Sequence, residues 1–200
     1  MKGLLEVMIY EKNIICQRIN ESINIKNKIL EDENLINIIY GLVIELRECL
    51  LKKEGKLLIC GNGGSASDAL HMTGEIVGRF QRERNPYPAI ALNADITTLT
   101  AIGNDYGYDT VFERPVEAYM TSKDIFIGIS TSGNSENVYK AALKAKEKKG
   151  VTAALLGKDG GKIAKVVDYP IVIPSDITAR IQESHITIIH VICEMLEIVL

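Results

Sequence analysis

The hydrophobic positions in the first quarter of the chain recur at helical spacing. Residues three or four positions apart form this pattern: Leu35, Ile38, Ile39, Leu42, Val43, Leu46 and Leu50. Apolar residues at this spacing line one face of a helix, and the Gly55 that follows is typical of a helix end. The preceding stretch, residues 19–26, indicates another helix. We therefore predict a helical N-terminal segment over residues 1–54.

From Lys56 onward, short apolar runs alternate with longer amphipathic segments. The runs are residues 57–60 (LLIC), 89–92 (AIAL), 125–129 (IFIGI), 153–156 (AALL) and 171–173 (IVI). Short unbroken apolar strands separated by segments of helix length are typical of a parallel sheet with helices on both faces. The pattern predicts an α/β core over residues 55–200, built on a five-stranded parallel sheet. Because no linker or low-complexity tract interrupts the chain, we expect a single domain over residues 1–200.

Composition and charge argue against several classes of partner. The net charge of -3 gives no basic surface for nucleic acid or for an acidic membrane, so we expect neither as a partner. No stretch reaches the roughly 18 to 20 uncharged apolar residues of a spanning helix. Glu6 and Glu11 interrupt the apolar N-terminus where a signal peptide would have its core. The cysteines form no CxxC pair, which indicates reduced thiols, and we expect a cytoplasmic protein.

Two turns rich in glycine, serine and asparagine directly follow predicted strands. The first is residues 61–65 (GNGGS), and the second is residues 130–135 (STSGNS). In open α/β sheets, ligands bind outside the carboxyl ends of the strands. Glycine permits close approach of the backbone there, and the N–H groups at a helix start favour anions. The two turns therefore predict a site for a phosphate or a polyol.

Two other interpretations of these turns compete with this one. Either turn alone is compatible with an ordinary strand-to-helix connection that carries a serine or asparagine N-cap. The first turn, together with Ala66, also satisfies the G-x-G-x-x-A pattern of a dinucleotide site. Such a site needs an acidic residue about 20 positions further on, at the end of the second strand. Here that strand ends near Asn93 and the nearest acid, Asp95, lies well past that distance.

His71 and Glu75 lie four residues apart in the segment after the first turn. On a helix they share one face, about one turn beyond the glycines. Such a pair can bind a metal ion, or it can place a carboxylate base beside an imidazole. A solvated ion pair on a helix surface has the same spacing. The position next to the candidate phosphate site favours a functional role.

The last segment, residues 180–200, predicts a long helix that carries Gln182 and His190. On a straight helix these two residues are separated by about 12 Å along the axis, so they cannot both reach one atom. Either Gln182 lies at a frayed helix start, or the two belong to sites shared between subunits. The apolar neighbours of His190 also leave it open as a buried structural histidine.

Six stretches of the sequence together resemble one family. In order they are CGNGGSASDALHMTGEIVGRF, PAIALNAD, AIGNDYGYDTVFERPVEA, GISTSGNSENVYKA, LLGKDGGKIA and ARIQESHITIIHVICEMLE. From about residue 30 to the end, the chain resembles the sedoheptulose 7-phosphate isomerases (phosphoheptose isomerases) of the SIS, or sugar isomerase, fold. The resemblance implies a three-layer α/β/α domain and a homotetramer with active sites at subunit interfaces. The implied reaction converts sedoheptulose 7-phosphate to D-glycero-D-manno-heptose 7-phosphate, the first step towards nucleotide-activated heptose.

The resemblance also implies roles for individual residues. Four match a metal site, usually assigned zinc, with one ion per subunit: His71, Glu75, Gln182 and His190. Glu75 and His190 also match the acid/base pair. The implied substrate contacts are Asn62, Gly63, Gly64, Glu75, Asn104, Asp105, Ser130, Thr131, Ser132, Ser135 and Gln182, with the serine turn holding the phosphate. Some members have an aspartate where this chain has Ala179, which removes one possible polar helper.

A non-catalytic function is the main alternative. SIS domains also serve as sugar-phosphate sensors, and one relative of this family binds the bacterial replication initiator protein. That relative lacks the helix glutamate and the last-helix histidine, which this chain has as Glu75 and His190. Their presence favours an enzyme.

Overall fold

The N-terminal quarter of the protein is helical, as its hydrophobic spacing predicts. In this computed structural model the backbone is described for residues 2–198 and the side chains for residues 11–198. Helix α1 (Lys2–Glu31) is followed by α2 (Glu33–Arg47) and a π-helical turn (Glu48–Lys52). The carboxylate of Asp32 between the two helices accepts a 2.9 Å hydrogen bond from the Leu35 N–H and so caps α2.

A five-stranded parallel sheet forms the centre of the molecule. Its strands are β1 (Leu57–Gly61), β2 (Ala89–Ala91), β3 (Ile125–Ser130), β4 (Val151–Gly157) and β5 (Tyr169–Ile173). They lie in the order β2-β1-β3-β4-β5, and every neighbouring pair is parallel. This confirms the predicted sheet. Strand β5 starts two residues earlier than its apolar run, because Tyr169 and Pro170 pair with β4 although their composition is not typical of a strand.

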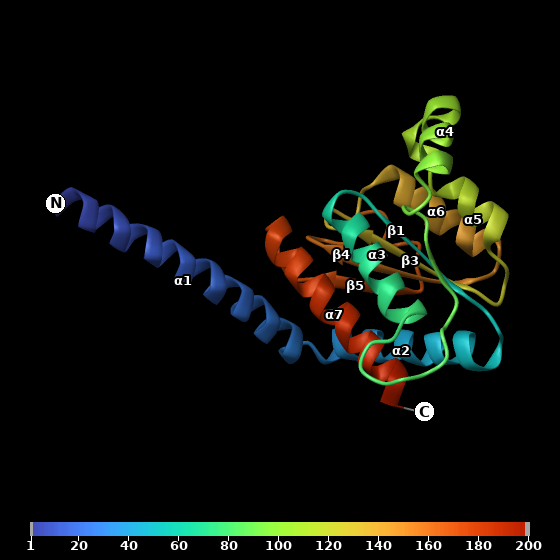
Figure 1. Ribbon diagram of the computed structural model, residues 1–200, viewed down its shortest axis with the longest axis horizontal. Helices are drawn as coiled ribbons and strands as arrows, with labels where there is room; N and C mark the ends of the chain where they lie inside the picture. Colours follow the sequence, from blue (N-terminus) through green and yellow to red (C-terminus); the bar gives the residue numbers. More distant parts are fainter. Residues whose placement is uncertain (1, 199–200) are drawn as a thin grey trace.

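Helices cover both faces of the sheet and make three layers (Figure 1). The remaining helices are α3 (Gly64–Val77), α4 (Ile96–Tyr106), a 3-10 turn (Tyr108–Thr110), α5 (Glu113–Tyr119), α6 (Glu136–Glu147) and α7 (Thr178–Ile198). Because side chains alternate along a strand, Leu57 and Ile59 join a core with α2, α3 and α7. Leu58 and Cys60 join a second core with α5 and α6 on the other face.

Two helices extend beyond the three layers. The first part of α1 projects from the body of the molecule, and α4 stands out at the opposite end (Figure 1). In the part of the chain that the structure describes, no helix is long and apolar enough to cross a membrane.

Candidate active site

The two predicted turns lie side by side at one edge of the sheet. They follow β1 and β3, which are neighbours, and the strand order changes direction between these two strands. That is the position at which open α/β sheets bind ligands. Asn62 in the first turn exchanges two amide hydrogen bonds, of 2.9 and 3.0 Å, with Asn137 in the first turn of α6. The Tyr108 hydroxyl donates a third bond to Asn62 Oδ1, at 3.0 Å.

Three hydroxyl groups converge in the second turn. Ser130 Oγ lies 2.9 Å from Ser135 Oγ and 3.5 Å from Ser132 Oγ. Ser135 is also the N-cap of α6, and its side chain makes no capping hydrogen bond. The turn therefore presents clustered hydroxyl donors at a helix N-terminus, an arrangement that suits a phosphate group.

Gly133 fixes the shape of the serine turn. Its φ of +67° is in the left-handed region, and a Cβ at this residue would lie 2.1 Å from the carbonyl oxygen of Gly160. Its own carbonyl accepts a 3.1 Å hydrogen bond from the Ile163 N–H. The serine turn is thus held against the loop that follows β4, and glycine is required at its tip.

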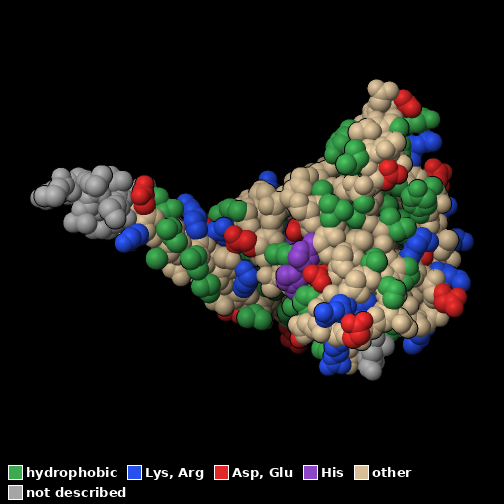
Figure 2. Space-filling view, in the orientation of Figure 1, with side chains coloured by type: hydrophobic (Ala, Val, Ile, Leu, Met, Phe, Trp, Pro, Cys, Tyr) green, Lys and Arg blue, Asp and Glu red, His purple; other side chains and the backbone are tan. Residues whose placement is uncertain are grey.

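The side chains of His71, Glu75 and His190 meet on the surface between α3 and α7. The Nε2 atoms of the two histidines are 3.0 Å apart, and His71 Nε2 is 3.2 Å from a Glu75 carboxylate oxygen. One ligand atom from each of the three lies within 4.8 Å of the others. The His71 side chain is 43% exposed and Glu75 is 25% exposed, so a ligand can approach. Figure 2 shows histidine side chains with a carboxylate beside them on this open face.

One predicted distance is wrong. The sequence pattern predicts His71 about one turn beyond the glycine turn, but α3 begins at Gly64 itself, so His71 lies two turns further on. That corresponds to about 10 Å along the helix axis. The helix starts this early because the Gly63 carbonyl already accepts bonds from the N–H groups of Ala66 and Ser67. The glycine turn and His71 therefore lie at two separate ends of the site.

Gln182 lies at the glycine end of this site. A Cβ at Gly64 would be 2.3 Å from its side-chain nitrogen, so α7 packs against the start of α3 there. Eight residues later, His190 of α7 meets His71 of α3. The two helices run alongside each other, and Gln182 and His190 are two turns apart, as the straight helix predicts. Gln182 as a fourth metal ligand stays a prediction.

The buried structural histidine of α7 is His185, and His190 is partly exposed. His185 is fully buried, and its Nε2 lies 2.9 Å from the Leu156 carbonyl oxygen at the end of β4. Burial lowers the pKa of His185 to about 4, against the opposing effect of that hydrogen bond. This ring is therefore neutral and connects α7 to the sheet.

A carboxylate that the sequence pattern does not single out lies one turn before His71. Burial raises the pKa of Asp68 to about 6, and the neighbouring His71 opposes this shift. Among the described atoms, Asp68 Oδ2 is buried without a hydrogen-bond partner.

The family of the chain follows from its similarity to known proteins. The SIS domain family matches residues 24–157 of the chain. The phosphoheptose isomerase of Sulfurimonas denitrificans is 51% identical over 186 residues, which cover 93% of this chain and 95% of that protein. The chain belongs to the phosphoheptose isomerase family.

Solved structures of the phosphoheptose isomerase family share the fold over nearly the whole chain. The enzyme from Neisseria gonorrhoeae has a TM-score of 0.87 at 40% identity and covers 93% of this chain and 98% of its own. The enzyme from Francisella tularensis has a TM-score of 0.87 at 36% identity, with 92% and 97% covered. The three-layer SIS fold predicted from the sequence is therefore confirmed.

Two of the predicted substrate contacts lie apart from the others. Asn104 and Asp105 are exposed on the projecting helix α4, and an amide nitrogen of Asn104 donates a 2.8 Å bond to Asp105. Within the described residues, neither forms a hydrogen bond to a predicted site residue outside this pair. Their assignment stays a prediction of the family resemblance.

Sequence reasoning missed several residues that shape the site. Asn137 and Tyr108 fix the Asn62 amide, and Phe80 stacks on His190 with ring centroids 5.5 Å apart. Asn137 stands two residues after the serine turn, so its position next to a polar turn was the available signal. Tyr108 and Phe80 gave none, because their contacts depend on the tertiary fold.

Proposed function

We propose that the protein converts sedoheptulose 7-phosphate to D-glycero-D-manno-heptose 7-phosphate through an enediol. The observation that carries this proposal is the meeting of Glu75 and His190 on two parallel helices of a phosphoheptose isomerase family chain. These are the two residues that the non-catalytic alternative lacks. The reaction moves a carbonyl from C2 to C1, so a proton must leave one carbon and return to its neighbour.

Glu75 is the group that we assign to this proton transfer. A carboxylate placed over both carbons can remove the proton from C1 and deliver it to C2. His190 is assigned to the oxygens, where an imidazole can donate and accept protons near neutral pH. The partial exposure of Glu75 supports this role, because a fully buried carboxylate could not reach a substrate.

The donor set of the site suits zinc. Zinc–nitrogen distances of about 2.0–2.1 Å in tetrahedral geometry separate two ligand atoms by about 3.3 Å. The separations of 3.0 and 3.2 Å among His71, Glu75 and His190 are close to this value. These three residues would hold the ion. Gln182 lies two turns from His190 on α7, so it could complete this metal site only from a second subunit of the proposed tetramer. A bound zinc would supply Lewis-acid stabilisation of negative charge on the substrate oxygens.

We assign the phosphate to the serine turn and the sugar hydroxyls to the glycine turn. The clustered hydroxyls of Ser130, Ser132 and Ser135 support the first assignment, with Thr131 in the same turn. Two amides support the second assignment: Asn137 holds the amide of Asn62 within this turn, and the amide of Gln182 packs against Gly64. About 10 Å of helix separates this turn from His71, which leaves room for an extended sugar chain.

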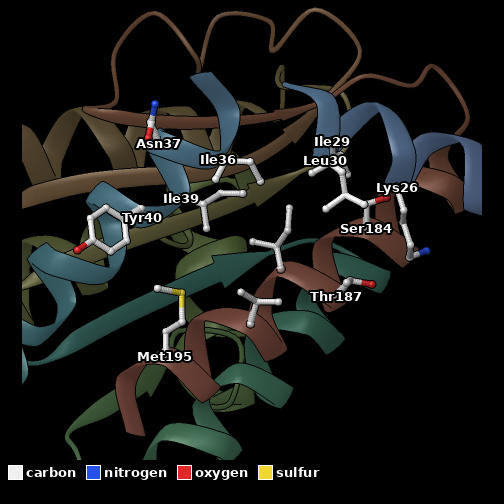
Figure 3. A pocket seen from close by; sticks show the side chains of 12 residues that line it. Lys26, Ile29, Leu30, Ile36, Asn37, Ile39, Tyr40, Ser184, Thr187 and Met195 are labelled. Carbon is white, nitrogen blue, oxygen red and sulfur yellow. The ribbon is translucent and has the colours of Figure 1, made fainter. Parts of the chain in front are cut away.

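Assembly into a homotetramer with active sites between subunits is part of the same proposal. Ile15, Ile19 and Ile23 repeat every four residues along α1 and are 60%, 57% and 49% exposed. Beside them, α1, α2 and α7 enclose an apolar pocket of about 500 Å³ (Figure 3). An apolar stripe next to an apolar pocket is typical of an interface between copies of a chain. The α1 stripe of a second copy is the occupant that we assign to this surface.

A cytoplasmic location is also part of the proposal. Four free cysteines, of which Cys49, Cys60 and Cys193 are buried, support a reducing compartment.

An isomerase assay on sedoheptulose 7-phosphate tests the proposed function. We expect the purified protein to form the aldose phosphate, and we expect a chelator to abolish turnover that added zinc then restores. No conversion under either condition would favour the sensor alternative. Conversion that a chelator does not affect would support the isomerase function and contradict its dependence on a metal ion.

A further inference from the structure

One buried carboxylate holds the loop that connects α3 to β2. Glu197, near the end of α7, has a side chain that is only 3% exposed. It accepts hydrogen bonds from the backbone N–H groups of Phe80, Gln81 and Arg82, at 2.9, 2.8 and 2.9 Å. A fourth bond comes from Arg84 Nε at 3.1 Å. A buried carboxylate is stable only when it is satisfied in this way.

The same loop places an aromatic ring on His190. Glu197 follows His190 by seven residues, so the two side chains lie on the same face of α7, about 10 Å apart along its axis. The loop crosses this face, and the Phe80 ring stacks on the His190 ring with centroids 5.5 Å apart and planes inclined by 25°. Glu197 thus fixes the backbone of the residue whose ring limits the orientation of His190.

Arg84 connects Glu197 to Glu75, the other assigned acid/base residue. Its Nη2 donates a 2.8 Å hydrogen bond to the Glu75 carbonyl oxygen, and its Nη1 donates a 3.0 Å bond to the Ile76 carbonyl oxygen. These two carbonyl groups lie in the last turn of α3, where carbonyl oxygens have no N–H donor within the helix. The Arg84 side chain is 8% exposed, and its Cζ lies 4.3 Å from the centre of the Tyr87 ring. Arg84 therefore fixes the helix end from which Glu75 projects.

We propose that Glu197 is a positioning residue of the active site, which sets the geometry of His190 through Phe80 and that of Glu75 through Arg84. The inference rests on the proposed roles of Glu75 and His190. Anchoring the end of α7 alone would need only an apolar side chain. Instead, the groups that donate hydrogen bonds to the Glu197 side chain all belong to the loop after α3, and this loop contacts both His190 and Glu75. Burial raises the pKa of Glu197, but its donors outweigh burial and lower the pKa to about 2, so it stays ionised during turnover.

Glu197→Gln tests the inference, with Glu194→Gln as the matched control on an exposed position of the same helix. We expect kcat to fall at least 10-fold in Glu197→Gln while KM changes less than 3-fold, because the substrate contacts remain and the geometry of the reacting groups is lost. We expect Glu194→Gln to match the wild type.

The second measurement does not depend on activity. The chain has three histidines, so the ring proton signal of His190 can be assigned by proton NMR with His71→Gln and His190→Gln.

The His190 signal reports on the Phe80 ring above it. We expect this signal to move in Glu197→Gln and in Phe80→Leu, and to stay in place in Glu194→Gln. A folded Glu197→Gln protein with an unchanged His190 signal and wild-type kcat would overturn the inference.

If Glu197→Gln does not fold, the kinetics of Phe80→Leu and Arg84→Lys test the inference in its place. A drop in kcat at constant KM in both supports the inference, and wild-type kcat in both refutes it. Should the wild type itself lack isomerase activity, the proposed function fails, while the NMR comparison still tests the positioning.

Discussion

Gly64 shows how the absence of one side chain shapes the site. A Cβ at this position would lie 2.3 Å from the Gln182 side-chain nitrogen, which is closer than real contacts allow. Gln182 would have to move away from the glycine turn. The sequence marked Gly64 as a position of close approach, but its neighbour from α7 could be identified only in the fold.

We therefore expect Gly64→Ala to weaken substrate binding. Loss of one neutral hydrogen bond should raise KM for sedoheptulose 7-phosphate roughly 2- to 10-fold, with a smaller effect on kcat. Gly74→Ala is the control on the same helix, because a Cβ there meets no atom within 4 Å. Steady-state kinetics of both variants check this prediction. Equal KM values in Gly64→Ala and the wild type would contradict it.

The elements of the fold were predictable to different degrees. The strands could be predicted from the sequence, because buried parallel strands need unbroken apolar runs. The shared face of His71 and Glu75 was also predictable, because four-residue spacing on a helix is a local property. The contact of His71 with His190, which is 119 residues away in the sequence, was not, since it depends on how α3 and α7 pack. The axial position of His71 was wrong by one turn because local pattern fixes helix boundaries poorly.

Helix α7 and strand β4 are joined by a histidine whose titration should affect stability. His185 has a folded pKa of about 4, and an unfolded histidine titrates at about 6.5. Between these values the unfolded chain binds a proton that the folded chain does not. Stability is therefore lost as the pH falls below about 6.5, by about 2 kcal/mol at a pH of about 5.

His185→Gln tests this link between α7 and the sheet. We expect the variant to lose less of its free energy of unfolding than the wild type between neutral and mildly acidic pH, by about 2 kcal/mol. Chemical denaturation at both pH values measures the difference. An identical pH dependence in the two proteins would show that His185 does not titrate as its burial requires.

The assembly of the whole molecule depends on the surface of α1. Hydrophobic spacing predicted a helical N-terminal segment, but its projection from the body is a property of the three-dimensional structure (Figure 1). A projecting helix with an apolar stripe exposes surface that a second copy could cover. The division into one domain over residues 1–200 stays a prediction.

Ile19→Glu should therefore shift the protein towards smaller species. A charge in an apolar interface must be desolvated, and this cost opposes association. Gln17→Glu introduces the same charge at an exposed position about 160° around the helix axis from Ile19 and should leave assembly unchanged. Light scattering after size-exclusion chromatography gives the mass of each. A wild-type monomer, or an Ile19→Glu protein with wild-type mass, would contradict the assigned interface.

The turnover of sedoheptulose 7-phosphate by Glu75→Gln, with bound metal measured in the same sample, tests whether Glu75 is the base. The amide retains the size of the side chain and cannot accept the substrate proton. With metal still bound, we expect kcat to fall by a factor of roughly 10² to 10⁴. Near-normal turnover of the metal-loaded variant would contradict the assignment of Glu75 as the base.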